Sequence, residues 1–238
     1  MPRRFRLPAD FNAFIASPET IIWHLIFMLL TVAICFKGIG GIEKASKFMM
    51  PALFVLLIVV VIRSVTLDGA SEGLRFIFEP NGGFTLSSIN AALGQVFYSL
   101  SLCMGITITY GSYLSKKENI VKSCGIVAGM DTTLAGFAGV AIFPAGFVFG
   151  LEPGQGAGLI FGTLPKVFGS MMGGSIFAIA FFVLVFFAAI TSSIALLEVV
   201  VSFTIDSWGW ERKKSVILVG IIEFLLGIPS ALSFGLLG

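Results

Sequence analysis

Long apolar runs separated by short polar segments dominate this chain of 238 residues. A helix that crosses a bilayer needs about 20 predominantly apolar residues, and the apolar runs predict six such spans. We place these spans at residues 21–36, 45–67, 87–113, 120–150, 175–205 and 215–237. The connection at 151–174 holds only a short apolar piece, Leu159–Phe168, which indicates a re-entrant or surface-lying hairpin. The pattern predicts an all-α polytopic membrane protein in a single domain.

Composition excludes several classes of protein. Hydrophobic residues make up 57% of the chain and charged residues 12%, and the mean hydropathy is +1.02, which excludes a soluble globular protein. The net charge of +2 is spread over short connections, so no nucleic-acid partner is indicated. Three cysteines in apolar runs and a single histidine predict neither a disulfide framework nor a metal cluster. The sequence has no nucleophile elbow and no phosphate loop, so it does not indicate a soluble-type enzyme.

Basic residues predict an orientation in the plasma (inner) membrane. If connections alternate sides, one side receives Lys37, Lys44, Lys47, Lys116, Lys117, Lys122, Arg212, Lys213 and Lys214. Positively charged loops favour the cytoplasm, so this side is expected to be cytoplasmic. Residues 1–20 and the hairpin at 151–174 are then extracellular, although three arginines near the N-terminus oppose that assignment. Residues 1–20 lack an apolar core of their own, so they are not a cleaved signal peptide.

The third span carries polar side chains where a purely structural span would carry Leu or Val. They are Gln95, Ser99, Ser101, Thr107 and Thr109. Irregular backbone at membrane depth occurs only where protein or a watery cavity surrounds it, so we predict a helix that is broken in mid-membrane and exposes carbonyls to a solute or ion. Alternatively, the hydroxyls bond to their own backbone or to neighbouring helices, and Gly105 and Gly111 only permit close packing.

Asp131 is an acid within the fourth span. A carboxylate at membrane depth needs a cation or a donor, and a hard cation prefers oxygen ligands. We therefore predict a sodium site that uses Ser99 and Asp131. The alternative is that Asp131 faces a water-filled vestibule or bonds neighbouring hydroxyls. The run Thr191-Ser192-Ser193 in the fifth span is by itself a weak signal, and Trp23 and His24 at the start of the first span are expected to be interfacial anchors.

Four motifs resemble the neurotransmitter:sodium symporter family, in its bacterial branch, from about Ala9 to the C-terminus. They are Ala-Leu-Gly-Gln-Val-Phe-Tyr-Ser-Leu-Ser-Leu from Ala92, Ile-Thr-Tyr-Gly-Ser-Tyr from Ile108, Phe-Phe-Ala-Ala-Ile-Thr-Ser-Ser-Ile-Ala from Phe186 and Gly-Ile-Glu-Lys-Ala from Gly41. The resemblance implies that the six spans correspond to helices four to nine of a twelve-helix core. The expected fold is thus a partial LeuT-type inverted-repeat transporter core, with one helix broken at mid-membrane.

The same resemblance implies roles for individual residues. The implied substrate site has Tyr98 as an aromatic lid and Ser101 with the backbone of Leu102, Cys103, Met104 and Gly105 as its floor, and is lined by Ser99 and Leu196. Ser99 and Asp131 are the implied ligands of a first Na+. The Ala188 carbonyl and the Thr191 and Ser192 hydroxyls are the implied ligands of a second Na+. Because Asp131 supplies a negative charge, chloride is not expected to be required.

Gly41 and Pro51 match the family pattern for unwinding near the cytoplasmic gate, which implies a gating role. Two departures affect the expected function. Cys103 stands where glycine is usual and would narrow the pocket, and the family's first helix, which completes the substrate and ion sites, has no counterpart in the 238 residues.

The resemblance therefore implies sodium-coupled symport of a small neutral amino acid across the lipid bilayer by alternating access, by a fragment that is inactive alone. The alternative is a non-transporting remnant, or a split half that needs a partner chain carrying the missing helices. An intramembrane enzyme is disfavoured, because we find one acid at depth and no paired base.

Overall fold

The computed structural model describes residues 11–79, 85–148, 150, 161, 165, 168–169 and 174–233. The elements within these ranges are helices, and no strand occurs among them. The helices are α1 (Phe11–Ile15), α2 (Glu19–Cys35), α3 (Ile39–Val65), α4 (Ser71–Phe78), α5 (Leu86–Ser99), α6 (Ile106–Ser112), α7 (Ile120–Val148), α9 (Gly174–Trp208) and α10 (Arg212–Leu232). The prediction of an all-α chain is confirmed.

Four helices, namely α3, α7, α9 and α10, are long and apolar enough to cross a membrane. Helix α2 is equally apolar but has only 17 residues. The remaining predicted span is divided into α5 and α6. The membrane limits of all six spans stay predictions, and most of the expected hairpin at 151–174 lies outside the described residues, as do residues 1–10 and 234–238.

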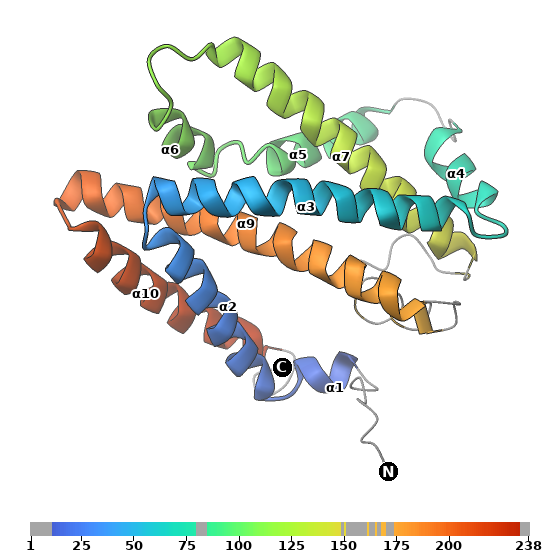
Figure 1. Cartoon of the computed structure of the whole chain (residues 1–238), viewed down its shortest axis with the longest axis horizontal. Coiled ribbons are helices and arrows are strands. Elements are labelled where there is room, and N and C mark those ends of the chain that lie inside the picture. Colours follow the sequence, from blue (N-terminus) through green and yellow to red (C-terminus); the bar gives the residue numbers. More distant parts are fainter. Residues whose placement is uncertain are drawn as a thin grey trace.

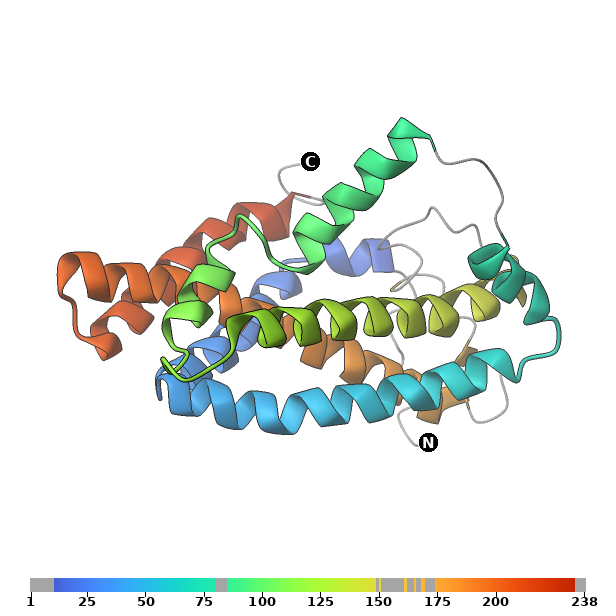
Figure 2. The ribbon, with the colours of Figure 1, turned by 90° about the horizontal axis from the view of Figure 1, so that it is seen from above.

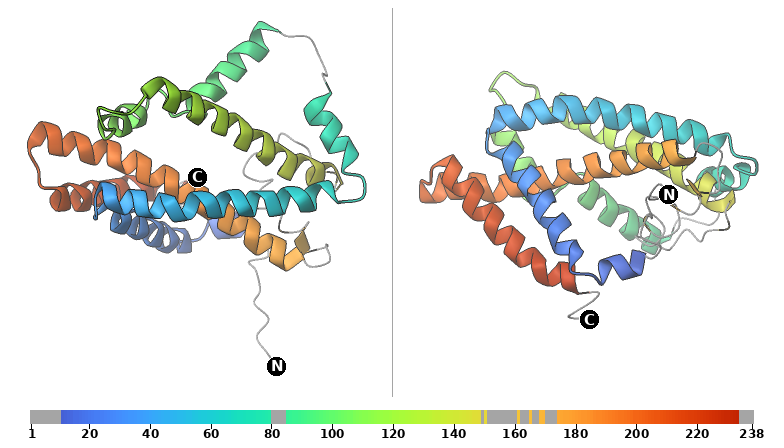
Figure 3. Two further views of the ribbon diagram at one scale, coloured as in Figure 1. Left: turned by 45° about the horizontal axis from the view of Figure 1, so that its top comes forward. Right: turned by 60° about the horizontal axis from the view of Figure 1, so that its bottom comes forward.

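The long helices form a layered bundle in which α9 is the common partner of α2, α3 and α10. Helix α3 packs against both α7 and α9, and α10 packs against α2 and α9. Figure 1 shows α3 and α9 running lengthwise, with α7 on one side of them and the α2 and α10 pair on the other. The further views agree that α5 stands away from this bundle (Figures 2 and 3). No residue of α5 is buried.

The basic connections gather at one end of the molecule. The α2–α3, α6–α7 and α9–α10 turns all lie at the left of Figure 1. At the α9–α10 turn, the rings of Trp208 and Trp210 are 5.0 Å apart, and the Lys214 ammonium lies 4.8 Å from the centre of the Trp210 ring. Tryptophan and lysine are typical of a membrane–water interface, so this end suits the side predicted to be cytoplasmic.

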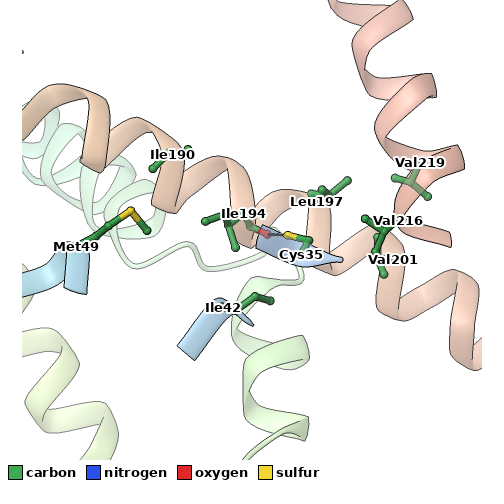
Figure 4. Packing of buried hydrophobic residues seen from close by; sticks show 9 residues of the cluster. All are labelled: Cys35, Ile42, Met49, Ile190, Ile194, Leu197, Val201, Val216 and Val219. Carbon is green, nitrogen blue, oxygen red and sulfur yellow. Dashed lines mark hydrogen bonds between the residues drawn. The ribbon is translucent and has the colours of Figure 1, made fainter. Parts of the chain in front are cut away.

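The main core lies where α2, α3 and α10 meet α9. Its buried residues, drawn in Figure 4, are Cys35, Ile42, Met49, Ile190, Ile194, Leu197, Val201, Val216 and Val219. A second cluster joins α3, α7 and α9 and contains Leu57, Val60, Ala141, Phe168 and Phe181. In a bilayer, where lipid tails are as apolar as these side chains, such clusters stabilise the bundle through close packing.

Two connections differ from the sequence prediction. The connection between the first two predicted spans, residues 37–44, is shorter than predicted, because α3 already begins at Ile39 after Gly38, whose φ of 71° suits a residue without a side chain. The loop expected at 68–86 contains the amphipathic helix α4, which packs on α7. Phe76 of α4 contacts Phe143 and Phe147 of α7, with ring centres 5.2 Å apart in both pairs.

Helix α7 continues through Pro144, and other elements meet it at this residue. Ser64 of α3 accepts a hydrogen bond from the Ala145 amide through its hydroxyl oxygen, at 3.2 Å. On the α4 side, Gly73 is buried against the backbone of Phe143 and Pro144, and a Cβ at this position would overlap the Pro144 Cα. The approach of α4 to α7 therefore depends on the absence of a side chain at residue 73.

We expect Gly73→Ala to lower the free energy of unfolding by about 1–3 kcal/mol, because a methyl group forced against backbone atoms requires α4 to shift. The measurement is thermal and denaturant unfolding of the purified chain in detergent. Gly125→Ala in α7 is the matched control, since nothing lies within 4 Å of a Cβ there. Equal effects of the two substitutions would contradict this account of the α4–α7 contact.

Candidate sodium and substrate site

The third predicted span is broken, as the sequence indicates. Helix α5 ends at Ser99 and α6 begins at Ile106. Between them, φ is 54° at Ser101, 64° at Cys103 and 78° at Gly105, and a left-handed conformation is uncommon for residues other than glycine. Within the described chain, no backbone hydrogen bond joins the amides of Cys103, Met104 or Gly105 to another residue. The break thus presents unpaired backbone groups.

Ser99 and Asp131 come together beside this break. The Ser99 hydroxyl donates a hydrogen bond of 2.9 Å to Oδ2 of Asp131, which joins the end of α5 to α7. Both residues are half-buried. The second carboxylate oxygen of Asp131 has no hydrogen-bond partner among the described residues. The pair is therefore a set of oxygen atoms with spare acceptor capacity.

A second set of oxygen atoms lies on α9. The Thr191 hydroxyl donates to the Ala188 carbonyl at 2.9 Å and to the Phe187 carbonyl at 3.0 Å. The Ser192 hydroxyl also donates to the Ala188 carbonyl, at 3.1 Å. Of the three residues named for a second sodium ion, Thr191 and Ser192 thus each hold a hydroxyl within hydrogen-bond distance of the Ala188 carbonyl. No hydrogen bond joins this set to Ser99 or Asp131 in the part of the chain that the structure describes.

Both sets have the chemistry that a hard monovalent cation requires. Their atoms are hydroxyl, carbonyl and carboxylate oxygens, whereas imidazole and thiolate ligands would favour transition metals. Among the described residues, no group of three or more His, Cys, Asp or Glu side chains is placed to hold a metal ion. The residues fit sodium in kind, but each set supplies fewer oxygens than a desolvated cation needs.

The residues named for the substrate lie at the break, apart from Leu196 of α9, and several of them are exposed. Tyr98 is 70% exposed and Leu196 of α9 is 49% exposed. Met104 is 38% exposed, and Cys103 carries an exposed free thiol. Gly105 approaches α9 so closely that a Cβ would lie 2.9 Å from Val199 Cγ1. The break therefore faces α9 on one side and is uncovered on the other.

The two residues named for gating lie in a continuous helix, because α3 runs unbroken through Gly41 and Pro51. A Cβ at Gly41 would lie 2.5 Å from the Ile34 carbonyl oxygen. In this conformation, Gly41 allows the start of α3 to fold back against the end of α2.

One functional candidate was not predicted from the sequence: the acid Glu198 of α9, which is 0% exposed. Arg212 binds both of its carboxylate oxygens, at 2.9 and 2.6 Å. The Tyr113 hydroxyl donates to Oε1 at 2.6 Å, and the Arg212 guanidinium also donates to the Cys35 carbonyl. This bidentate pair connects α9 and α10 to the ends of α2 and α6.

The prediction of one acid at membrane depth is therefore wrong. Glu198 and the half-buried Glu223 both lie within helices that qualify as membrane spans. Each appears in the sequence as one charged residue inside an apolar run. Glu198 could have been identified from the rule that a charge at membrane depth needs a partner. Arg212, which follows the turn after α9, is such a partner.

Comparison with known proteins establishes the family. The profile of the "Sodium:neurotransmitter symporter family" matches residues 9–237. This chain belongs to the sodium:neurotransmitter symporter family. The family assignment and the LeuT-type fold that the motifs implied are thus confirmed.

Relatives in this symporter family include an uncharacterized sodium-dependent transporter of Bacillus subtilis, YhdH, which is 42% identical over 96% of the chain and 51% of its own length. A transporter of Haemophilus influenzae with a similar description is 43% identical over 91% of the chain and 48% of its own length. The crystal structure of MhsT in complex with L-phenylalanine matches with a TM-score of 0.85 and 46% identity, covering 96% of the chain and 53% of MhsT.

These relatives are named as sodium-dependent transporters and not as enzymes, so the family is one of membrane transporters that use Na+. The symporter chain spans about half the length of the relatives it matches.

We expect Arg212→Met to lower the free energy of unfolding by about 3–5 kcal/mol, because it leaves the Glu198 carboxylate buried without a cation. The double variant Arg212→Met, Glu198→Leu should lose clearly less, since no charge remains buried. Lys116→Met in the exposed α6–α7 turn is the control and should change stability by less than about 0.5 kcal/mol. Chemical unfolding in detergent measures all three, and an equal loss in the single and double variants would argue against the buried pair.

Proposed function

We propose that this chain forms the part of a sodium-coupled amino-acid symporter that contains the broken helix and half of each ion site. The observation that carries the proposal is the contact of Ser99 with Asp131 beside the break. In a family of sodium-dependent transporters, a carboxylate and a hydroxyl at this position are suited to hold Na+ next to a substrate. The oxygens of Ala188, Thr191 and Ser192 on α9 are suited to a second Na+.

The proposed substrate is a neutral amino acid. Its carboxylate would lie near the sodium ion held by Ser99 and Asp131, and its amino group would meet carbonyls exposed between Leu100 and Gly105. Tyr98, Met104 and Leu196 offer apolar surface for the side chain, and no Lys or Arg lies among these residues. MhsT, the 46% identical structural relative, was solved with L-phenylalanine. The thiol of Cys103 takes up room at the break and favours a smaller side chain.

Coupling follows from unequal affinity. Sodium and substrate shift a transporter between outward and inward states only to the extent that they bind the two states differently. Ser99 lies at the end of α5 and Asp131 lies on α7, so an ion bound between them would join the break to the bundle. Unwinding of α3 between Gly41 and Pro51 is the proposed opening movement on the cytoplasmic side. The proposed location is the plasma membrane, with the basic turns inside.

The exposed side of α5 and of the break indicates that further helices pack there in the intact transporter. Helix α5 has no buried residue, and its side chains include Asn90, Gln95 and Ser99. Lipid cannot satisfy such groups. The chain alone should therefore be inactive, and helices that correspond to the rest of the relatives' length would cover this face. The second candidate, a non-transporting remnant or a split half with a partner chain, is favoured by the same exposed face.

We expect no sodium-dependent binding of labelled amino acids by the 238-residue chain, and binding when it is joined to the first three helices of a relative. In the joined protein, Asp131→Asn should weaken binding about tenfold or more, which corresponds to about 1.4 kcal/mol. Glu118→Gln in the exposed α6–α7 turn is the control and should leave affinity unchanged. Scintillation proximity with a panel of neutral amino acids makes the measurement.

Binding by the chain alone would disprove the need for further helices. No binding by either protein would favour the remnant.

Replacing chloride by gluconate should leave binding by the joined protein unchanged, because the Asp131 carboxylate supplies the negative charge beside the ion. Asp131→Asn removes that charge, so chloride should then restore part of the lost affinity. Binding isotherms at constant sodium with either anion test this. A chloride requirement in the parent protein would refute the proposed role of Asp131 as an internal anion.

A further inference from the structure

Helix α10 lies at the outer edge of the bundle, beside α2 (Figures 1 and 3), and packs on α2 and α9. Its outward side carries two columns of large apolar residues. Residues spaced by four share one face of a helix, and all members of the columns are exposed, from 36% at Leu218 to 72% at Leu226. The columns are Ile217, Ile221 and Leu225, and Leu218, Ile222 and Leu226.

Each column begins with a lysine at the start of α10. Lys213 precedes Ile217 by four residues, and Lys214 precedes Leu218 by four residues. Side chains on a helix point toward its N-terminus, so the two ammonium groups extend toward the membrane surface while their stems lie along apolar surface. Each column is therefore cationic at one end and apolar along the rest of its length.

The two ammonium groups lie beside aromatic rings and are free to meet an anion. That of Lys214 is 4.8 Å from the centre of the Trp210 ring, and that of Lys213 is 5.9 Å from the centre of the Phe36 ring, which follows α2. Both lysines are exposed. In the part of the chain that the structure describes, neither of them forms an ion pair.

The surroundings of the two lysines keep a positive charge. Arg212 is neutralised by the buried Glu198. Lys37 adds a third exposed lysine, because the adjoining Gly38 lies against the Arg212 side chain. The exposed acids nearby in the sequence are Asp206 and Glu211. Three lysines thus stand against two free acids, which favours an anionic partner.

The outward side of α10 suits lipid chains better than another helix. Interfaces between membrane helices are enriched in small residues, and the inward side of α10 follows this rule. Gly220 lies against Val32, and Gly227 lies against the imidazole of His24. The His24 ring thus packs between the helices, which differs from the interfacial anchoring expected from sequence. The outward columns contain only Ile and Leu, whereas the uncovered side of α5 carries polar groups that lipid cannot satisfy.

We propose that one anionic phospholipid binds along α10, with its headgroup phosphate between Lys213 and Lys214 and its acyl chains on the two apolar columns. The bound lipid holds the start of α10, and with it the pair of Arg212 and Glu198, at the membrane surface. The site is separate from both sets of sodium-binding oxygens. Only its assignment to the cytoplasmic leaflet rests on the orientation proposed above.

Native mass spectrometry of the purified 238-residue chain tests the site, because one spectrum counts both bound lipids and chains. The chain in detergent is titrated with anionic phosphatidylglycerol or with zwitterionic phosphatidylcholine of the same acyl chains. The first phosphatidylglycerol should bind about tenfold more tightly, since each lysine near an anionic headgroup contributes roughly fivefold. Equal affinities would overturn the proposal. A dimer that binds no lipid would also overturn it and would assign the columns to a second copy of the chain.

The double variant Lys213→Gln, Lys214→Gln should bind the two lipids about equally. The variant Lys213→Arg, Lys214→Arg keeps both charges and should keep the preference. The matched control is Lys116→Gln, Lys117→Gln in the exposed α6–α7 turn, which should bind like the parent. An equal loss of preference in this control would mean that the charge of the whole basic end attracts the lipid, and the proposed site would be wrong.

Tryptophan fluorescence locates the lipid in a bilayer. The chain has three tryptophans, so Trp23→Phe, Trp208→Phe leaves Trp210, beside Lys214, as the reporter. Phosphatidylcholine nanodiscs are prepared with about one tenth of a brominated lipid. Brominated phosphatidylglycerol should quench Trp210 about threefold more than brominated phosphatidylcholine, because the lysines enrich the anionic lipid there. Equal quenching by the two lipids would contradict a phospholipid site beside Trp210.

Discussion

Backbone amides and carbonyls cannot be left unpaired in hydrocarbon, and this constraint explains the arrangement of the molecule. The long helices satisfy it internally; α2, α3 and α10 pack on α9, and α7 packs on α3. The segment between α5 and α6 does not, and it lies against α9 at Val199 while its other side is open. A break of this kind is stable only where protein, solute or ions take over the missing hydrogen bonds. The same backbone irregularity that would destabilise a structural span is what allows a transporter to bind its cargo.

The polar side chains are divided between long helices that pack in the bundle and one helix that has no buried residue. Asp131 on α7 and the Ala188, Thr191 and Ser192 set on α9 belong to continuous helices. Ser99 ends a helix without buried residues. Close approaches at glycines, such as Gly73 on Pro144 and Gly227 on His24, fix the scaffold around this less constrained segment. Ion binding between the two kinds of element would therefore order the break without rearranging the bundle.

Features that show in a local stretch of sequence could be predicted, and contacts between distant residues could not. Hydroxyl residues and glycines concentrated between Gly94 and Tyr113 predicted the break, and Asp131 stood out as an acid in a long apolar run. The pairing of Ser99 with Asp131 followed, because a carboxylate at membrane depth needs a cation or a donor. Glu198 was missed because its partner Arg212 lies across a turn, so no local spacing reveals the contact. The helix α4 was missed because the segment around it is rich in turn residues and its apolar side is short.

Helix α9 has 35 residues, so at 1.5 Å per residue it is about 50 Å long, well beyond the roughly 30 Å of the hydrocarbon layer. It must therefore tilt or project into the headgroups. The distance along the helix from Ser192 to Trp208 is about 24 Å. Treated as a rigid lever pivoting at Ser192, α9 converts a rotation of about 10° into a displacement of roughly 4 Å at Trp208. As long as the helix between them stays intact, the oxygens of Thr191 and Ser192 therefore move together with the aromatic turn at the membrane surface.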